Sequence, residues 1–225
     1  MPKTADIGEL IKHTPFFQDF DAEDIAMLAR SCRQMRIARN AFVFRLGDPA
    51  DGLYLVAAGA IKLALPASRG QGKVIEFFGP GQSFGEPFMF LARPYAADAQ
   101  ALEDSLLLWI DRQAIQAAID LHPSLARQML IGLSSRLHTL MRDIESVNLQ
   151  SASQRLIGYL LALPRKMDRA RFPCSKHLVA SKIGVAPATL SRLLRQLIRD
   201  GLILVEGRDV VIRSPSALER QLLAG

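Results

Sequence analysis

The chain has only two cysteines among its 225 residues, Cys32 and Cys174, and they stand far apart. No CxxC spacing occurs, which excludes a disulfide framework, a structural zinc site and a four-cysteine iron–sulfur cluster. Long apolar runs are also lacking, since stretches such as 105–110 fall far short of the roughly 18 residues that span a bilayer. The first ten residues hold no uninterrupted apolar signal core. We therefore expect a cytoplasmic protein with no membrane contact.

Signatures of catalysis are absent as well. The sequence has no Gly-Lys-Ser/Thr phosphate loop, no GxSxG elbow, no HExxH pair and no cysteine with an evident histidine base. Glu86 and Glu103 are isolated acids, for which a structural role near turns is expected. The sequence predicts that the protein is not an enzyme.

Acidic residues are scarce in the last third of the chain. Residues 149–225 carry 13 Lys and Arg against 5 Asp and Glu, whereas residues 1–148 carry 15 against 17. This asymmetry favours a polyanion as the partner of the carboxyl-terminal part, because neutralised phosphates release counterions. A merely solubilising basic face is the alternative interpretation.

Segment 178–197 predicts a helix-turn-helix. Apolar residues give the first helix one buried face, and Gly184 supplies the backbone freedom that a sharp turn needs. Leucines at 190, 193, 194 and 197 recur at steps of 3 and 4 residues, which leaves small polar and basic side chains on the other faces. Ahead of it, 165–171 reads as a loop and 172–176 as a short edge strand. A hairpin turning at 206–209 follows, as in a winged module.

The middle of the chain predicts strands and then one long helix. Short apolar runs at 42–44, 53–56, 61–65, 74–78 and 106–110 are separated by glycine-containing turns, as in a small antiparallel barrel or roll. After Pro123, a helix is expected from about 124 to 147. Its apolar residues follow a heptad seam that predicts a twofold dimer interface, with packing on the chain's own roll as the alternative. The seam comprises Leu130, Leu133, Leu137, Leu140, Ile144 and Val147.

These patterns together predict an α+β protein with three parts. Residues 1–122 are expected to form a β-roll domain, 123–148 a dimerisation helix, and 149–225 a winged helix-turn-helix; a role of the first part in sensing an effector is implied only by the resemblance that follows. Segments GDPADGLYLVAAGAIK at 47–62, GPGQSFGE at 79–86, TLSRLL at 189–194 and DGLI at 200–203 carry a resemblance to the Crp/Fnr transcription regulators along essentially the whole chain. The resemblance implies a cyclic-nucleotide-binding-like roll, a homodimer, a palindromic double-stranded DNA operator and contact with RNA polymerase.

At the effector-binding positions, the sequence differs from that of the best-known members of the family. Cyclic-AMP receptors hold the cyclic phosphate with an Arg-Ser pair, and the equivalent positions here are Ala96 and Ala97. Where those receptors hold the base with polar side chains, this chain has Leu140 and Met141. Because a buried phosphate without charged partners is costly, we expect an effector other than cyclic AMP.

Segments 88–101 and 135–146 are similar to the dissimilatory nitrate respiration regulators, a group associated with nitric oxide sensing through haem. That similarity implies an apolar effector crevice between the roll and the long helix. None of the four histidines stands in a motif that fixes it as a haem ligand, and we expect each to be exposed or solvated; His138, next to the seam, is the candidate if haem binds. An apolar small molecule, or no effector at all, is the alternative to haem. The predicted pocket residues are Gly85, Glu86, Phe88, Met89, Leu133, Leu137, Leu140 and Met141.

The resemblance also assigns DNA contacts. Thr189, Ser191 and Arg192 align with recognition-helix positions, and Arg192 is the natural bidentate donor to guanine. Ala188 stands where many relatives have a glutamate, so the usual Fnr-type target sequence is not expected. Predicted backbone contacts are Lys176, Lys182, Arg195 and Arg199. The competing hypothesis is a roll that serves as an interaction and dimerisation module without specific DNA binding.

Overall fold

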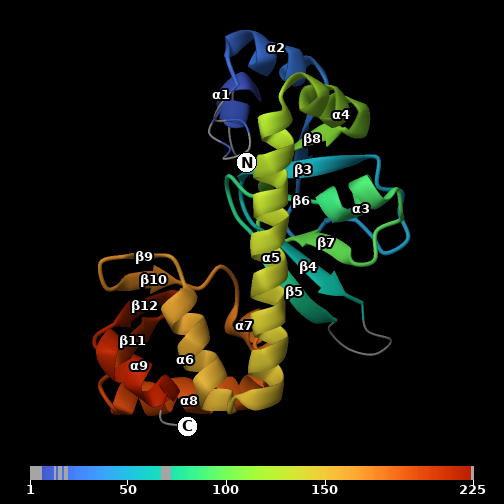
Figure 1. Ribbon diagram of the computed structural model, residues 1–225. Coiled ribbons are helices and arrows are strands. Elements are labelled where there is room, and N and C mark those ends of the chain that lie inside the picture. Colours follow the sequence, from blue (N-terminus) through green and yellow to red (C-terminus); the bar gives the residue numbers. More distant parts are fainter. Residues whose placement is uncertain (1–6, 13, 15–16, 18–19, 67–71, 224–225) are drawn as a thin grey trace. The chain divides into compact units, whose positions relative to one another are not determined.

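The computed structural model describes residues 7–12, 14, 17, 20–66 and 72–223. The chain divides into two compact units, Met1–Arg136 and Leu137–Gly225, and the boundary lies within the longest helix. Among the described residues, every helix is too short or too polar to cross a bilayer. The predicted α+β architecture is confirmed (Figure 1). The division at 122 and 148 stays a prediction.

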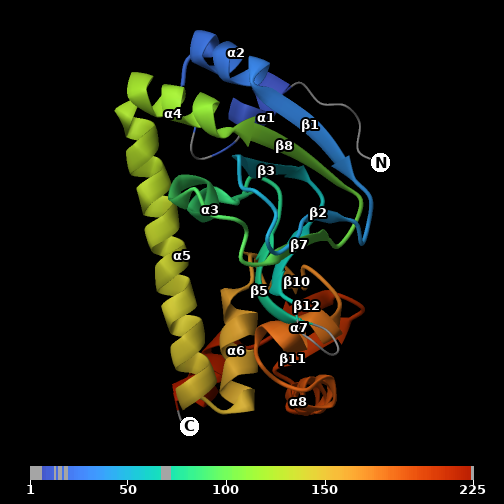
Figure 2. The same ribbon diagram turned by 90° about the vertical axis from the view of Figure 1, so that its right-hand side faces the viewer.

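The first unit is built mainly of short antiparallel strands, as the glycine-punctuated pattern predicts. Its elements are α1 (Ile7–Lys12), α2 (Ala22–Arg30), β1 (Cys32–Ile37), β2 (Phe42–Phe44), β3 (Gly52–Ala58), β4 (Ile61–Leu65), β5 (Lys73–Phe78), β6 (Ser83–Phe84), α3 (Glu86–Leu91), β7 (Asp98–Ala101), β8 (Ser105–Asp111), α4 (Arg112–Leu121) and the first half of α5 (Pro123–Leu149). The strands form two four-stranded sheets, in the orders β1-β8-β3-β6 and β2-β7-β4-β5. Figure 2 shows these strands from a second side. The five apolar runs of the sequence are all strands.

Strand β8 shows why its sequence is apolar at nearly every position. Successive side chains of a strand point to opposite faces. Leu108 and Ile110 therefore pack in one cluster with Leu125 and Met129 of α5, whereas Leu107 packs in a second, aromatic-rich cluster. The strand is buried on both faces, and one of these faces carries the amino-terminal half of α5.

Two of the described helices begin at capping boxes. Asp21 accepts hydrogen bonds from the backbone N–H groups of Glu23 and Asp24, and Asp24 in turn accepts from the backbone of Asp21, which is a capping box at the start of α2. Ser151 and Gln154 form a second capping box that begins α6 (Ala152–Ala162), directly after α5. The predicted long helix is confirmed, and it begins at Pro123 as the sequence indicates.

The second unit holds the carboxyl-terminal half of α5 and a winged helix-turn-helix. Its further elements are α6, β9 (Arg165–Lys166), β10 (Arg169–Arg171), α7 (Lys176–Lys182), α8 (Pro187–Arg199), β11 (Ile203–Glu206), β12 (Asp209–Ile212) and α9 (Pro215–Leu223). The four strands form one sheet in the order β11-β12-β10-β9. The predicted helix pair and hairpin are confirmed. Gly184, in the turn between α7 and α8, has φ +68°, a conformation that favours glycine.

One local prediction is wrong. Segment 165–171, interpreted as a loop, forms the β9–β10 hairpin, whereas 172–175 is not a strand. All side chains of this hairpin except Ala170 are exposed. Its sequence therefore lacks the alternation of apolar and polar residues from which a strand is predicted. Ala170 pairs with Val210 of β12, and this pairing joins the hairpin to the wing.

Candidate nucleic-acid interface and effector region

Helix α8 has one apolar and one polar face. Its four leucines, Leu190, Leu193, Leu194 and Leu197, are at most 6% exposed and anchor the helix in its unit. Among the predicted contact residues, Thr189 is half-buried, and five side chains are exposed: Ala188, Ser191, Arg192, Arg195 and Arg199. The structure thus brings these six predicted positions to one helix and presents five of them to solvent.

The polar side chains of α8 differ in how far they are already engaged. The Ser191 hydroxyl donates to the Pro187 carbonyl at 2.9 Å, and Arg195 Nε donates to the Ser191 carbonyl at 3.3 Å. Among the residues that the structure describes, no hydrogen bond or ion pair engages Arg192. Its five N–H donors are therefore available to a base edge.

The amino terminus of α8 lacks a side-chain cap. Ala186 occupies the cap position and has no side-chain acceptor, and Pro187 is the first helical residue. The backbone N–H groups of this first turn carry the positive end of the helix dipole. They are suited to a phosphate oxygen.

The two predicted lysine contacts have different surroundings. Lys176, the first residue of α7, is exposed. The Lys182 ammonium lies 2.6 Å from an Asp143 carboxylate oxygen on α5, and only 15% of its side chain is exposed. Lys182 is thus already paired within the chain, unlike the exposed cations of α8.

The predicted effector region contains a buried ion pair in the first unit. Glu86 begins α3 directly after Gly85, whose φ of +96° favours glycine. Arg136 Nη1 of α5 donates to Glu86 Oε2 at 3.1 Å, and Arg136 Nη2 donates to the Ser83 carbonyl. The Arg136 guanidinium also lies 5.2 Å from the centre of the Phe78 ring. The sequence did not single out Arg136, because no local sequence pattern indicates a contact between residues that are 50 positions apart.

Two buried oxygens of this region have no hydrogen-bond partner among the described residues, namely Glu86 Oε1 and Ser83 Oγ. Of the positions aligned with the phosphate-binding pair of cyclic-AMP receptors, Ala97 is buried and Ala96 is exposed, and neither has a polar side chain. This corner of the roll therefore offers hydrogen-bond acceptors and an arginine that is already bonded.

The other predicted pocket residues have varied surroundings. Met89 is packed in the core beside Leu125 and Met129, and Phe88 meets Tyr95 edge-on with ring centres 5.7 Å apart. On α5, Leu133 and Leu140 are half-buried, whereas Leu137 and Met141 are exposed. The grouping of these residues in one effector pocket stays a prediction.

The described histidines do not provide an obvious axial ligand. His138 is exposed on α5, beside polar residues such as Arg142 and Asp143. His122 lies 2.7 Å from Asp24, and His177 is exposed. A haem ligand ordinarily projects into an apolar pocket that controls access to the iron. His138 does not fit that setting within the single chain.

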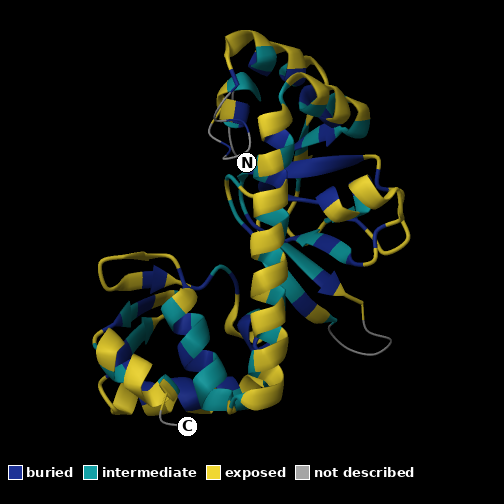
Figure 3. Cartoon of the chain, viewed as in Figure 1, coloured by how far each residue is buried: buried dark blue, intermediate teal, exposed yellow. Residues whose placement is uncertain are grey.

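The predicted seam of α5 is largely uncovered (Figure 3). Leu130, Leu137 and Ile144 are each more than 60% exposed, and Val147 is 44% exposed. A row of large apolar side chains left in water is unfavourable by roughly 1.5 to 3 kcal/mol for each fully exposed residue. Such a face is typical of a helix that packs against a partner.

Comparisons with known proteins agree with this architecture. Residues 34–122 match the cyclic nucleotide-binding domain family, and residues 154–221 match the Crp-like helix-turn-helix domain family. The chain is 24% identical over 222 residues to a CRP-like cAMP-activated global transcriptional regulator of Mycobacterium tuberculosis, covering 96% of this chain and 99% of the relative.

Two solved structures extend the comparison. FixK2 from Bradyrhizobium japonicum has a TM-score of 0.77 at 21% identity, with 84% of this chain and 96% of FixK2 covered, which shows the fold. DNR from Pseudomonas aeruginosa is 30% identical, with 98% of this chain and 99% of DNR covered and a TM-score of 0.51. Together with the two matched domains and their order, these likenesses show that the chain belongs to the Crp/Fnr family and is a transcription regulator with a helix-turn-helix DNA-binding domain, not an enzyme.

Proposed function

We propose that the protein is a homodimer that reads a palindromic duplex with α8 and responds to an effector other than cyclic AMP. The observation that carries the DNA-binding part is the two-faced α8, with four buried leucines and an exposed row that includes the unengaged Arg192. A recognition helix of this kind enters the major groove with its amino-terminal residues toward the bases.

Four polar side chains near the exposed face of α8, its Arg199 and Lys176 of α7 fall into two groups in this proposal, namely base contacts and phosphate contacts. Arg192 donates two hydrogen bonds to guanine O6 and N7, and Thr189 and Ser191 contact neighbouring base edges. Arg195, Arg199 and Lys176 bind phosphates and fix the register. The uncapped first turn of α8 adds backbone donors for one more phosphate.

The dimer is supported by the exposed seam of α5. Twofold pairing of this helix covers the same apolar residues on both copies, because a twofold interface uses one surface patch twice. The two recognition helices are then presented to successive major grooves, one helical turn of about 34 Å apart. Contact with RNA polymerase is a further part of the proposal that the family resemblance implies.

Two observations support an effector that is not a cyclic nucleotide. The side chains of Ala96 and Ala97 provide neither a charge nor a hydrogen bond for a phosphate, and the nearby Arg136 is already bonded to Glu86 and Ser83. The orphaned acceptor Glu86 Oε1 favours a hydrogen-bond donor on the ligand, whatever the class of that ligand. We therefore expect this protein to share the architecture of the cAMP-activated M. tuberculosis relative but not its effector.

Haem with nitric oxide is the effector that the similarity to the nitrate respiration regulators implies. The exposed His138 does not support it, so we derive no step through haem. Haem titration of the full-length protein decides the point: a stoichiometric Soret band that shifts with nitric oxide would establish haem as the cofactor, and no stoichiometric uptake would remove it.

Fluorescence titration of duplex DNA tests the DNA-binding proposal. The full-length protein should bind promoter-derived duplexes with an affinity that falls steeply between about 50 and 200 mM salt, because phosphate contacts release counterions. It should also prefer some sequences over others at fixed salt. Binding that is equally weak on all duplexes would instead favour the interaction-module hypothesis.

A further inference from the structure

The helix-turn-helix is tied to α5 by a short ion pair. Asp143 projects from α5, and Lys182 lies in the last turn of α7, immediately before the turn that leads to α8. Lys182 Nζ and Asp143 Oδ2 are 2.6 Å apart, and the two side chains are 15% and 44% exposed. A charged hydrogen bond at this distance and burial is stronger and more directional than an exposed pair.

Arg155 of α6 makes a second attachment at the same turn. Its Nη1 donates to the Val147 carbonyl at 3.0 Å and to the Gln150 carbonyl at 3.4 Å. Its Nη2 donates to the Gly184 carbonyl at 3.3 Å. One planar guanidinium thus joins the last turn of α5 to the turn between α7 and α8. We call Asp143, Lys182 and Arg155 the hinge clamp.

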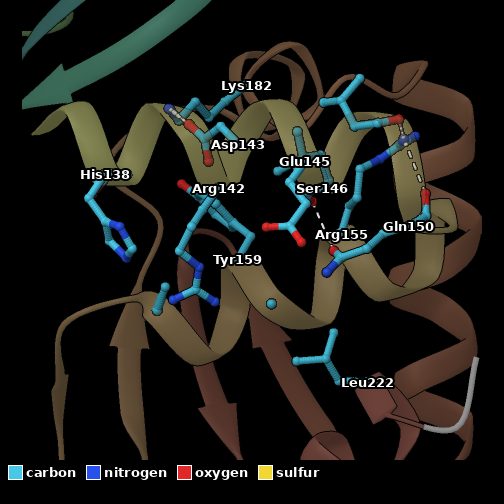
Figure 4. A pocket seen from close by; sticks show the side chains of 15 residues that line it. His138, Arg142, Asp143, Glu145, Ser146, Gln150, Arg155, Tyr159, Lys182 and Leu222 are labelled. Atoms are coloured by element: carbon cyan, nitrogen blue, oxygen red, sulfur yellow. Dashed lines mark hydrogen bonds and ion pairs between the residues drawn. The ribbon is translucent and has the colours of Figure 1, made fainter.

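A cavity of about 540 Å³ lies beside the hinge clamp (Figure 4). Side chains from α5, α6, α7 and α9 line it, including all three clamp residues, Arg142 and Leu222. Where this cavity lies, side chains of the four elements do not pack directly against one another as they do in a close-packed core. The angle between α5 and the helix-turn-helix therefore depends strongly on the polar attachments of the clamp.

The same stretch of α5 carries the proposed dimer seam. Ile144 follows Asp143 directly, and Val147, whose carbonyl accepts from Arg155, is a further seam residue. A clamp attached to α5 at these positions determines how far each α8 lies from the twofold axis of the proposed dimer. In a twofold dimer, a change in the geometry of the clamp would move the two recognition helices in directions related by the twofold rotation and would change the distance between them.

We propose that Asp143, Lys182 and Arg155 are positioning residues that set the half-site spacing that the dimer accepts. This inference rests on the proposed function, since it presupposes a dimer that binds two half-sites. It differs from the predicted role of Lys182 as a phosphate contact, because Lys182 acts through Asp143 and not on DNA. The clamp determines specificity for spacing, whereas Arg192 determines specificity for bases.

The test compares full-length wild type and Asp143→Asn on duplexes whose half-sites are moved apart or together by one base pair. The wild type should lose at least about fivefold in affinity for each incorrect spacing, comparable with a mismatched base pair. Asp143→Asn keeps the side-chain shape but removes the charge, so its affinities at the three spacings should fall within about twofold of one another. Its binding to a single half-site should be unchanged.

Glu145→Gln is the matched control. Glu145 also lies on α5 and lines the cavity, but within the described ranges it forms no ion pair. This variant removes the same charge and should keep the wild-type spacing preference. The exchanged pair Asp143→Lys with Lys182→Asp should restore much of that preference, and thermal unfolding of each variant shows that the fold is retained.

The outcomes separate this inference from the proposed function. Equal spacing discrimination by wild type and Asp143→Asn, or a uniform loss at every spacing and on the single half-site, would overturn the inference and leave the proposed function standing. If the wild type binds no duplex at any spacing, both are wrong.

Discussion

Arg136 and Glu86 form an ion pair of 3.1 Å in which the Glu86 side chain is only 1% exposed. The arginine stands on α5 and the glutamate on α3, so the pair joins the long helix to the roll. Because the Glu86 carboxylate is buried, leaving it without its cation would be costly to the first unit.

Removal of Arg136 should destabilise the protein. Arg136→Met leaves the Glu86 carboxylate buried without its cation, and we expect a loss of about 2 to 4 kcal/mol in the free energy of unfolding, measured by urea denaturation. Combining it with Glu86→Gln should recover much of the loss. Arg127→Met, at an exposed position of α5, is the control and should have little effect. Unfolding indistinguishable from wild type would show that the pair is not stabilising.

Arg192→Ala should change which bases are read. Loss of the bidentate contact should cost about 1 to 3 kcal/mol in DNA binding and relax base preference at one position of each half-site. Arg195→Ala should weaken binding about equally on all sequences and reduce the salt dependence. Affinities on a panel of single-base operator variants measure both effects, and a sequence-independent loss for Arg192→Ala would make it a phosphate contact.

The α5 seam should control the oligomeric state. Leu137→Asp places a charge in the proposed twofold interface and should shift the protein from dimer to monomer in sedimentation velocity at micromolar concentration. Leu121→Asp is the control, since Leu121 is 60% exposed and Leu137 61%, but Leu121 ends α4 outside the seam. A Leu137→Asp variant that remains dimeric would place the interface elsewhere.

Cyclic AMP should not bind the wild-type roll. Ala96→Arg with Ala97→Ser supplies the charge and hydroxyl that a cyclic phosphate needs, so calorimetry should detect cyclic AMP binding only after these substitutions. Detectable binding to the wild type, at an affinity equal to or above that of the double variant, would show that this chain holds the phosphate in another way.

The Cys32 thiol should be unreactive at neutral pH. Burial raises the pKa of Cys32 to about 12. An unfolded thiol ionises near 8.5, so between roughly pH 8.5 and 12 ionisation favours the unfolded chain, and stability should fall as the pH rises through this window. Iodoacetamide labelling followed by mass spectrometry should be slow at pH 8 and fast after denaturation. Rapid labelling of the native protein would contradict the raised pKa of this partly buried thiol.

The spacing of leucines is sufficient to predict the helix α8. Leu190, Leu193, Leu194 and Leu197 predict α8, because burial of one helix face requires this periodicity. Strand β7 was not predicted, since its buried residues are the small Ala99 and Ala101, which give a weak strand signal. The small side chains nevertheless lie in the core between neighbouring strands.

The contacts between elements could not be predicted in the same way. The Arg136–Glu86 and Lys182–Asp143 pairs join positions 50 and 39 residues apart, and tertiary packing alone brings them together. From its sequence, Lys182 is one more cation in a basic module. Only the structure shows that its charge is already paired.

Selection of bound duplexes from a random DNA pool by the full-length protein tests the central claim most directly. We expect an enriched site with twofold symmetry, whose half-sites lie about 10 base pairs apart from centre to centre and whose sequence preference changes when Arg192 is replaced by alanine. A pool that shows no enrichment even at low salt, or an enriched asymmetric site that is unaffected by Arg192→Ala, would contradict it.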